Sequence, residues 1–216
     1  MQTKLIILDF DGTLGDTRNN IVKTLRETLL QSGLPMASEE DCAATIGLKL
    51  YDAFLQLVPT LTEQQAQECV ELYREIFEIN KKQLMPKLFP HVLETIQELS
   101  QRGITLTIAS SRSNNTLQDF VKDMGLSQYI VYTIGAEDVA NAKPNPEPVL
   151  KTLQHLGMKA EETLVVGDMP YDILMGANAG TRTCGVTYGN ATRQQLADSK
   201  ADYIIDDFAE LLGIVF

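Results

Sequence analysis

The sequence predicts an α/β fold with a mainly parallel sheet and an all-helical segment inserted after the first strand. Short apolar runs alternate with amphipathic helical stretches over most of the chain. This alternation is typical of parallel sheets that are covered by helices on both faces. Residues 16–85 interrupt the alternation, and several apolar runs end in polar or acidic residues.

Six short apolar runs have the length and composition of buried strands. They lie at residues 5–8, 104–109, 130–134, 163–166, 183–186 and 203–205. Helical periodicity between several of them predicts helices at 90–101, 115–124, 146–156 and 171–179. Right-handed crossovers would place the carboxyl ends of the strands at one edge, where open, Rossmann-like sheets bind ligands.

Residues 16–85 contain no convincing strand. Apolar residues recur at helical spacing over 21–30 and again over 69–77, and Thr62 with Gln65 resembles a capping box. We therefore expect an α/β catalytic core formed by residues 1–15 and 86–216. Residues 16–85 would form a helical cap domain inserted after the first strand.

The composition narrows the class of protein. The 216 residues carry a formal net charge of −11, which repels polyanions and argues against a nucleic-acid partner. Three isolated cysteines fit a reducing compartment better than a disulfide framework. No apolar run approaches the roughly 20 residues of a membrane span, and no signal peptide is evident. We expect a cytoplasmic protein with no membrane partner.

Two carboxylates, Asp9 and Asp11, follow the first predicted strand, and Gly12 would permit a tight turn there. One carboxylate can attack phosphorus as a nucleophile. The other can give a proton to the leaving oxygen and later take one from water. The alternative is an acidic turn at a strand end, with Thr13 as a helix cap.

Polar residues also follow two later predicted elements. Ser110 and Ser111 precede a helix predicted to open near residue 114, where hydroxyl and N–H groups can bind phosphate oxygens. Lys143 lies beside Pro144 and close to Pro146, whose rings stiffen the backbone and would fix an ammonium group. Taken alone, the serine segment is more often a helix cap, and the lysine segment more often a surface lysine in a proline-rich turn.

Asp168 follows the strand predicted at 163–166, and Asp172 lies one helical turn later on the same side. Clustered with Asp9, they would offer the hard oxygen ligands that Mg²⁺ prefers. The alternative is a capping aspartate with Asp172 in solvent. In chain order, the strand ends supply a nucleophile, hydroxyls, a lysine and metal-binding acids, as phosphoryl transfer requires. We therefore predict a Mg²⁺-dependent phosphate monoester hydrolase that acts on a small phosphorylated metabolite.

The motifs and their order resemble the haloacid dehalogenase superfamily, and the resemblance covers the whole chain, including a helical cap after the first motif. The sequence is most similar to the phosphoglycolate phosphatase-like branch. In that branch, residues 46–50 resemble the cap loop that reaches into the active site.

The resemblance implies roles for the matching residues. Asp9 would be the nucleophile, Asp11 the acid/base, and Lys143 a charge that offsets Asp9. Thr13 would orient the Asp11 region. The phosphate-binding residues would be Thr13, Ser110, Ser111 and Lys143. The Mg²⁺ ligands would be Asp9, Asp11 through its carbonyl, Asp168 and Asp172. Candidates for substrate specificity are Lys49, Tyr51 and Arg112.

Two residues depart from the family pattern: Met169 replaces a common Ser or Thr, and His91 replaces a usual Gly. Four other activities need weighing. A phosphomutase usually carries a histidine shortly after the nucleophile, where this chain has residues 19–21, Asn-Asn-Ile. Asp11 argues against a dehalogenase, and the intact acid set argues against a non-enzymatic binding module. A pyrophosphatase stays open, as do phosphoglycolate, a nucleotide and a sugar phosphate as substrates.

Overall fold

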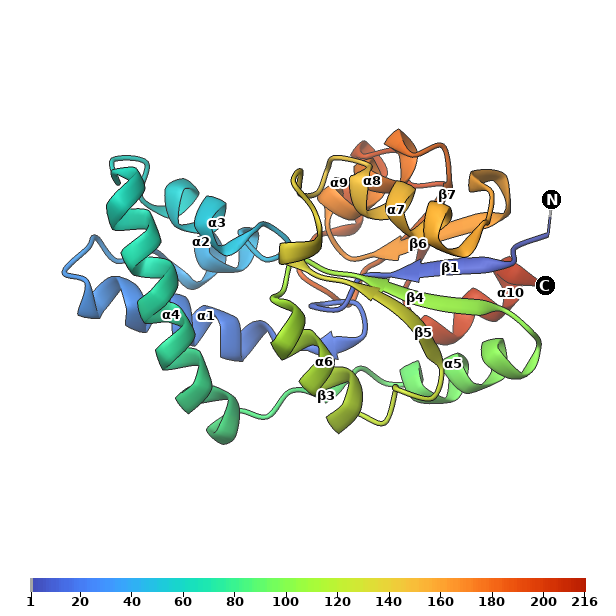
Figure 1. Ribbon diagram of the computed structural model, residues 1–216, viewed down its shortest axis with the longest axis horizontal. Coiled ribbons are helices and arrows are strands. Elements are labelled where there is room, and N and C mark those ends of the chain that lie inside the picture. The colour runs from blue at the N-terminus through green and yellow to red at the C-terminus, as the bar shows by residue number, and fades with distance from the viewer. Residues whose placement is uncertain (1) are drawn as a thin grey trace.

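The computed structural model describes residues 2–216, and its centre is a sheet of six parallel strands (Figure 1). The strand order is β5-β4-β1-β6-β7-β8. The bounds are β1 Leu5–Leu8, β4 Thr105–Ala109, β5 Ile130–Ile134, β6 Thr163–Gly167, β7 Arg182–Val186 and β8 Tyr203–Ile205. Each predicted strand is present to within one residue at either end, which confirms the Rossmann-like α/β fold class.

The central strand β1 explains why the motif residues meet. All four of its side chains are fully buried, as expected for a strand covered on both faces. Leu8 is in register with Ile108 of β4 and Val166 of β6. Because the three strands are parallel, the residues that follow them emerge side by side at the carboxyl edge of the sheet.

Helices cover both faces of the sheet (Figure 1). One face carries α5 Val92–Gln101, α6 Asn114–Asp123 and α10 Leu211–Val215, and the other carries α7 Glu147–Leu156, α8 Pro170–Asn178 and α9 Arg193–Asp198. Three 3₁₀ turns complete the core: η1 Ala136–Asp138, η2 Ala160–Glu162 and η3 Phe208–Glu210. The four predicted helices are α5 to α8. The helix expected from residue 90 begins two residues later, because His91 has a left-handed backbone with φ of 61°.

Between β1 and α5 the chain forms a group of four helices, here called the helical insertion (Figure 1). They are α1 Arg18–Gln31, α2 Glu39–Ala44, α3 Leu50–Leu57 and α4 Glu63–Gln83. The predicted capping box is confirmed: Gln65 N donates to Thr62 Oγ1 at 3.2 Å, and Thr62 N donates to Gln65 Oε1 at 3.0 Å. The domain boundaries at 15/16 and 85/86 stay predictions.

A two-stranded antiparallel ribbon joins the two connections of the insertion. It pairs β2 Gly15–Asp16 with β3 Lys87–Leu88. The expectation of no strand in 16–85 was therefore wrong at Asp16, because a two-residue strand shows no periodicity in the sequence. The ribbon brings both crossings of the chain together just after the carboxyl end of β1.

Aromatic side chains link the insertion to the core. The rings of Phe10 and Phe120 stack in the core with centroids 5.8 Å apart, and Phe77 of α4 meets Phe120 edge-on at 6.3 Å. Tyr73 stacks on Phe77 within the insertion at 5.9 Å. Such pairs contribute about 0.5–1.5 kcal/mol each beyond their burial.

Among the described residues, no helix is long and apolar enough to cross a membrane.

Candidate active site

Three of the predicted residues form a buried ion-pair network at the carboxyl edge of the sheet. Lys143 Nζ donates to Asp9 Oδ1 at 2.5 Å and to Asp172 Oδ1 at 2.7 Å. The three side chains are 1–5% exposed. Lys143 is therefore not a surface lysine in a proline-rich turn, and Asp172 does not lie in solvent. Asp172 Oδ2 also accepts the Met169 N–H at 3.0 Å, which fixes the start of α8.

A cluster of three buried acids lies beside the lysine. Oxygen atoms of Asp9, Asp168 and Asp172 all lie within 4.8 Å of one another. Asp168 Oδ2 accepts the backbone N–H of Asn190 at 2.7 Å and its Nδ2 at 2.8 Å. Asp168 Oδ1 is buried and has no hydrogen-bond partner within residues 2–216. Hard oxygen donors that include an unpaired buried oxygen fit a divalent cation such as Mg²⁺.

The electrostatics of the cluster also favour a cation. Burial raises the pKa of Asp9 to about 7, an effect that Lys143 opposes and that Asp172 and Asp11 reinforce. Burial, together with the charges of Asp9 and Asp172, raises the pKa of Asp168 well above its usual range. Burial also disfavours the charged form of Lys143, yet Asp172 and Asp9 hold its pKa above the usual value. One ammonium thus compensates only part of the negative charge.

Two glycines let the backbone approach these acids closely. A Cβ on Gly12 would lie 2.2 Å from Asp168 Oδ2, and the φ of +92° at Gly12 disfavours any side chain. A Cβ on Gly167 would lie 2.2 Å from Asp172 Cβ. The predicted need for a tight turn after Asp11 is therefore met by Gly12.

Asp11 points to a different cation from the one that holds Asp9. Arg112 Nε donates to Asp11 Oδ2 at 3.1 Å, and Nη2 donates to Oδ1. The guanidinium lies over the rings of Phe120 and Phe77, 4.7 and 5.2 Å from the centroids. Burial opposes the charge of Arg112, but Asp11 raises its pKa. The candidate specificity residue Arg112 is thus bound to the proposed acid/base.

The two predicted serines lie at the cavity, whereas Thr13 does not. Ser110 Oγ accepts the Arg112 N–H at 3.1 Å, and Ser111 Oγ donates to the carbonyl of Gly47 at 2.6 Å. Neither serine is the helix cap, because α6 begins after Ser113. Thr13 is fully buried, and its hydroxyl has no partner in the part of the chain that the structure describes. The role of Thr13 in phosphate binding stays a prediction.

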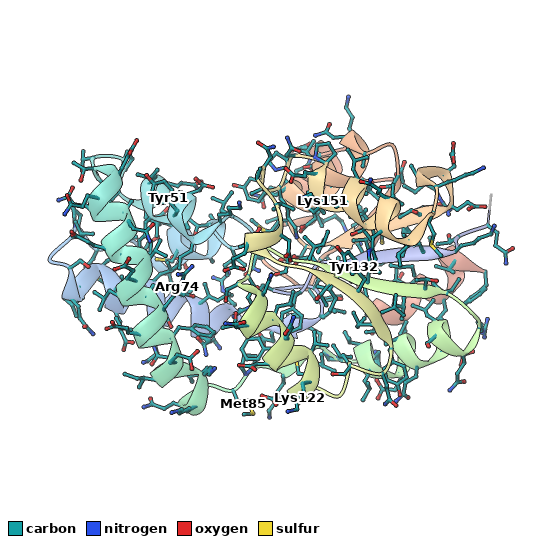
Figure 2. The ribbon with its side chains drawn as sticks, viewed as in Figure 1. Tyr51, Arg74, Met85, Lys122, Tyr132 and Lys151 are labelled. Atoms are coloured by element: carbon teal, nitrogen blue, oxygen red, sulfur yellow. The ribbon has the colours of Figure 1, made fainter. Side chains whose placement is uncertain are left out.

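A cavity of about 550 Å³ lies between the core and the helical insertion. Its core side includes Asp9, Asp11 and residues 110–113, and its other side is formed by α1, α3, α4 and the α2–α3 loop, residues 45–49. Lys49 and Tyr51 line it as expected, and Figure 2 labels Tyr51 on α3. Lys49 Nζ donates to the core carbonyl of Val139 at 2.9 Å, so this amine is bonded to the core.

Three residues were missed or left unassigned by sequence reasoning. Asn190 holds Asp168, and its position just after β7 is a strand-end signal like those used for the other motifs. Met169 is buried, and its Cγ lies 3.7 Å from the position of a Cβ on Gly47, so it lies beside the α2–α3 loop. His91 is exposed, with Nδ1 2.6 Å from Asp207, and does not line the cavity.

Fold and site together define an α/β enzyme with a buried carboxylate, a paired lysine and an acid cluster at the strand ends. Residues 6–186 match the family described as haloacid dehalogenase-like hydrolase, and the chain belongs to that family. The predicted family and enzyme class are confirmed.

Two relatives and a solved structure agree with this placement. The probable phosphatase IndB of Dickeya dadantii is 35% identical over 214 residues, which cover 97% of this chain and 92% of that protein. The pyrophosphatase PpaX of Anoxybacillus flavithermus is 34% identical over 215 residues, covering 100% and 98%. A crystal structure of a predicted phosphoglycolate phosphatase from Haemophilus somnus has a TM-score of 0.88 at 27% identity, covering 100% of this chain and 99% of that one.

Proposed function

We propose that this chain is a Mg²⁺-dependent phosphatase that hydrolyses a small-molecule phosphate monoester through an aspartyl-phosphate intermediate on Asp9. The observation that carries the proposal is the position of Asp9. It directly follows the central strand, lines the cavity and accepts a hydrogen bond from Lys143 Nζ at 2.5 Å. We expect its partner to be a phosphorylated metabolite of the cytoplasm, and we expect it to bind neither nucleic acid nor membranes.

The residues present can perform both halves of the reaction. A carboxylate oxygen of Asp9 attacks phosphorus, the ester P–O bond breaks, and the leaving oxygen takes a proton from Asp11. Water then attacks the phosphorus and gives a proton to Asp11, and the bond between Asp9 and phosphorus breaks. Lys143 and Ser110 stabilise the negative oxygens of the phosphoryl group.

The acid cluster would hold the metal. The ligands would be Asp9 and Asp168, with the carbonyl of Asp11 and with Asp172 either directly or through water. When bound, Mg²⁺ neutralises charge on the phosphoryl oxygens. Asn190 keeps Asp168 oriented by two hydrogen bonds to one of its oxygens, which leaves the other oxygen for the metal.

The helical insertion would act as a cap. Both of its connections pass through the β2–β3 ribbon beside β1, so a rotation there would move all four helices relative to the sheet. Closure would exclude water and bring the α2–α3 loop over the substrate. Two contacts of that loop, Ser111 Oγ to Gly47 O and Lys49 Nζ to Val139 O, would hold the closed form.

Pyrophosphate hydrolysis is the second candidate, since the same nucleophile could attack a phosphoric anhydride. The PpaX relative favours it. A phosphomutase is less favoured, because residues 19–21 supply no histidine.

Asp9→Asn tests the assignment of the nucleophile. The amide keeps the size of the side chain but cannot attack phosphorus, so turnover of phenyl phosphate with Mg²⁺ should be abolished while circular dichroism stays unchanged. Acid-quenched wild type should carry phosphate on Asp9 by mass spectrometry. Asp16→Asn is the matched control, because the Asp16 side chain is exposed and does not line the cavity. Wild-type turnover by metal-loaded Asp9→Asn protein would refute the proposal.

A further inference from the structure

The cavity is larger than a simple phosphate compound needs. Its volume of about 550 Å³ falls in the range of roughly 300–1,000 Å³ that organic ligands occupy in proteins. Pyrophosphate and phosphoglycolate each add only one small group to the phosphoryl group that Asp9 would attack. Either would leave most of the cavity to water.

The part of the cavity formed by the insertion is largely apolar. Its side chains come from α1, the α2–α3 loop, α3 and α4: Ile21, Leu25, Ile46, Leu50, Val70 and Phe77. A wall of this kind gains free energy when a ligand displaces water from it. The wall therefore fits a carbon framework attached to the phosphate, such as an aromatic or alicyclic group.

Three cationic side chains line the cavity, and two of them already have partners. Arg112 is bound to Asp11, and Lys49 donates to the Val139 carbonyl. Arg74 of α4 forms no hydrogen bond or ion pair with any residue of the range 2–216. Figure 2 labels it on α4, which forms part of the insertion side of the cavity.

The two glutamates that line the cavity have other partners. Glu78, one turn further along α4, pairs with Lys81 at 2.8 Å. Glu137 on the core side of the cavity accepts the Asn114 N–H at 2.9 Å. Gln67, two turns before Arg74, also lines the cavity, and its Nε2 donates to Glu71 Oε1 at 3.4 Å. A guanidinium without a protein partner is suited to bidentate binding of a carboxylate or phosphate.

We propose that the substrate is an organic phosphate monoester with an apolar framework and a second anionic group, and that Arg74 binds this group. The phosphate to be removed would lie at Asp9, the framework against the apolar wall, and the second anion at α4. The inference rests on the proposed phosphatase function and narrows its substrate class. The anion is a carboxylate or a second phosphate, and Arg74 is a specificity-determining residue for either.

Binding of phosphonates tests the site without turnover. We would titrate 4-carboxybenzylphosphonate, its 4-carbamoyl analogue and the corresponding bisphosphonate into Mg²⁺-loaded protein by calorimetry. The carboxylate and the bisphosphonate carry an anionic group at both ends. The wild type should bind one or both of them at least tenfold more tightly than the amide, and the tighter-binding ligand identifies the second anion. Arg74→Gln should reduce the preference to below threefold.

Lys82→Gln is the matched control. It removes the same charge from the same helix two turns further on, but Lys82 does not line this cavity. This variant should keep the tenfold preference. Equal loss in Lys82→Gln would assign the effect to the overall charge of α4, and an unchanged preference in Arg74→Gln would also overturn the proposal.

Kinetics separate this inference from the proposed function. The kcat/KM of the wild type for 4-carboxyphenyl phosphate or its bisphosphate counterpart should exceed that for pyrophosphate, and Arg74→Gln should raise KM more than it lowers kcat. If the wild type hydrolyses phenyl phosphate but has its highest kcat/KM for pyrophosphate, the inference is overturned and the phosphatase function stands. Arg74-dependent binding without turnover of any ester would overturn the function and leave the anion site intact.

Discussion

Replacement of Lys143 by methionine tests the charge balance of the site most directly. The side chain keeps its length and loses its ammonium group. Lys143 Nζ lies 2.5 Å from Asp9 and 2.7 Å from Asp172, and all three side chains are buried. The substitution therefore leaves two acids, beside the equally buried Asp168, without their common cation.

The size of the effect follows from that burial. Removing one partner of a buried ion pair typically costs about 3–5 kcal/mol, because the other charge stays desolvated. A carboxyl group that takes up a proton limits this cost, so we expect about 3 kcal/mol of lost stability. Loss of the charge that would face the phosphoryl group should also lower kcat/KM about a hundredfold, or roughly 3 kcal/mol.

Urea denaturation in EDTA and in excess Mg²⁺ would measure the stability, and aryl phosphate hydrolysis the activity. Mg²⁺ should restore part of the lost stability, since it would bind the acids of the folded protein. Lys4→Met is the control, because Lys4 forms an exposed pair with Glu162 that is worth about 1 kcal/mol or less. A stability loss below about 1 kcal/mol, together with activity reduced less than threefold, would show that Lys143 does not hold this role and would point to Arg112.

Three further outcomes are expected. Hydrolysis should require Mg²⁺ and be inhibited by Ca²⁺, which takes more ligands at longer distances; full activity after verified metal removal would contradict the cluster of Asp9, Asp168 and Asp172 as a metal site. The Glu147 carboxylate accepts hydrogen bonds from Lys151 and the backbone of Asn141 and Ala140, which lower its pKa to about 2. The stability it contributes is present above a pH of about 4.5 and is lost as pH falls toward about 2. Glu147→Gln should therefore flatten the acid side of a plot of unfolding free energy against pH, and an unchanged plot would refute this. Lys49→Ala removes the bond to the Val139 carbonyl, so hydrogen exchange in the α2–α3 loop should rise and KM should increase, whereas unchanged exchange would argue against this contact as part of cap closure.

Strands could be located from the sequence because the central ones are apolar on both faces. The β1 run is short, fully apolar and bounded by an acidic residue, so its limits were predicted to the residue. The β2–β3 ribbon was not predicted, because a two-residue strand is too short to show a period in the sequence. The pairing continues next to the ribbon, where the Phe89 N–H donates to the Leu14 carbonyl at 3.0 Å. Such pairing between distant segments leaves no local pattern.

The same distinction applies to the site. A single topological rule, that parallel strands end at one edge, brought Asp9, Ser110, Asp168 and Asp172 together, and the rule also covers the overlooked Asn190 after β7. The rule could not show which carboxylate would pair with Lys143 and which with Arg112. Arg112, which pairs with Asp11, also lies over the rings of Phe77 and Phe120, and Phe77 comes from the insertion.

These pairings resolve how a chain with a net charge of −11 can attract an anionic substrate. The site holds four carboxylates, on Asp9, Asp11, Asp168 and Asp172, and two cations, on Lys143 and Arg112. When all four carboxylates are ionised, four negative and two positive formal charges leave −2, which one Mg²⁺ would balance. The field that a phosphate meets is therefore set locally, because buried charges are screened much less than those on the surface. Arg74 then adds a positive charge at the insertion side of the cavity, where the rest of the substrate would lie.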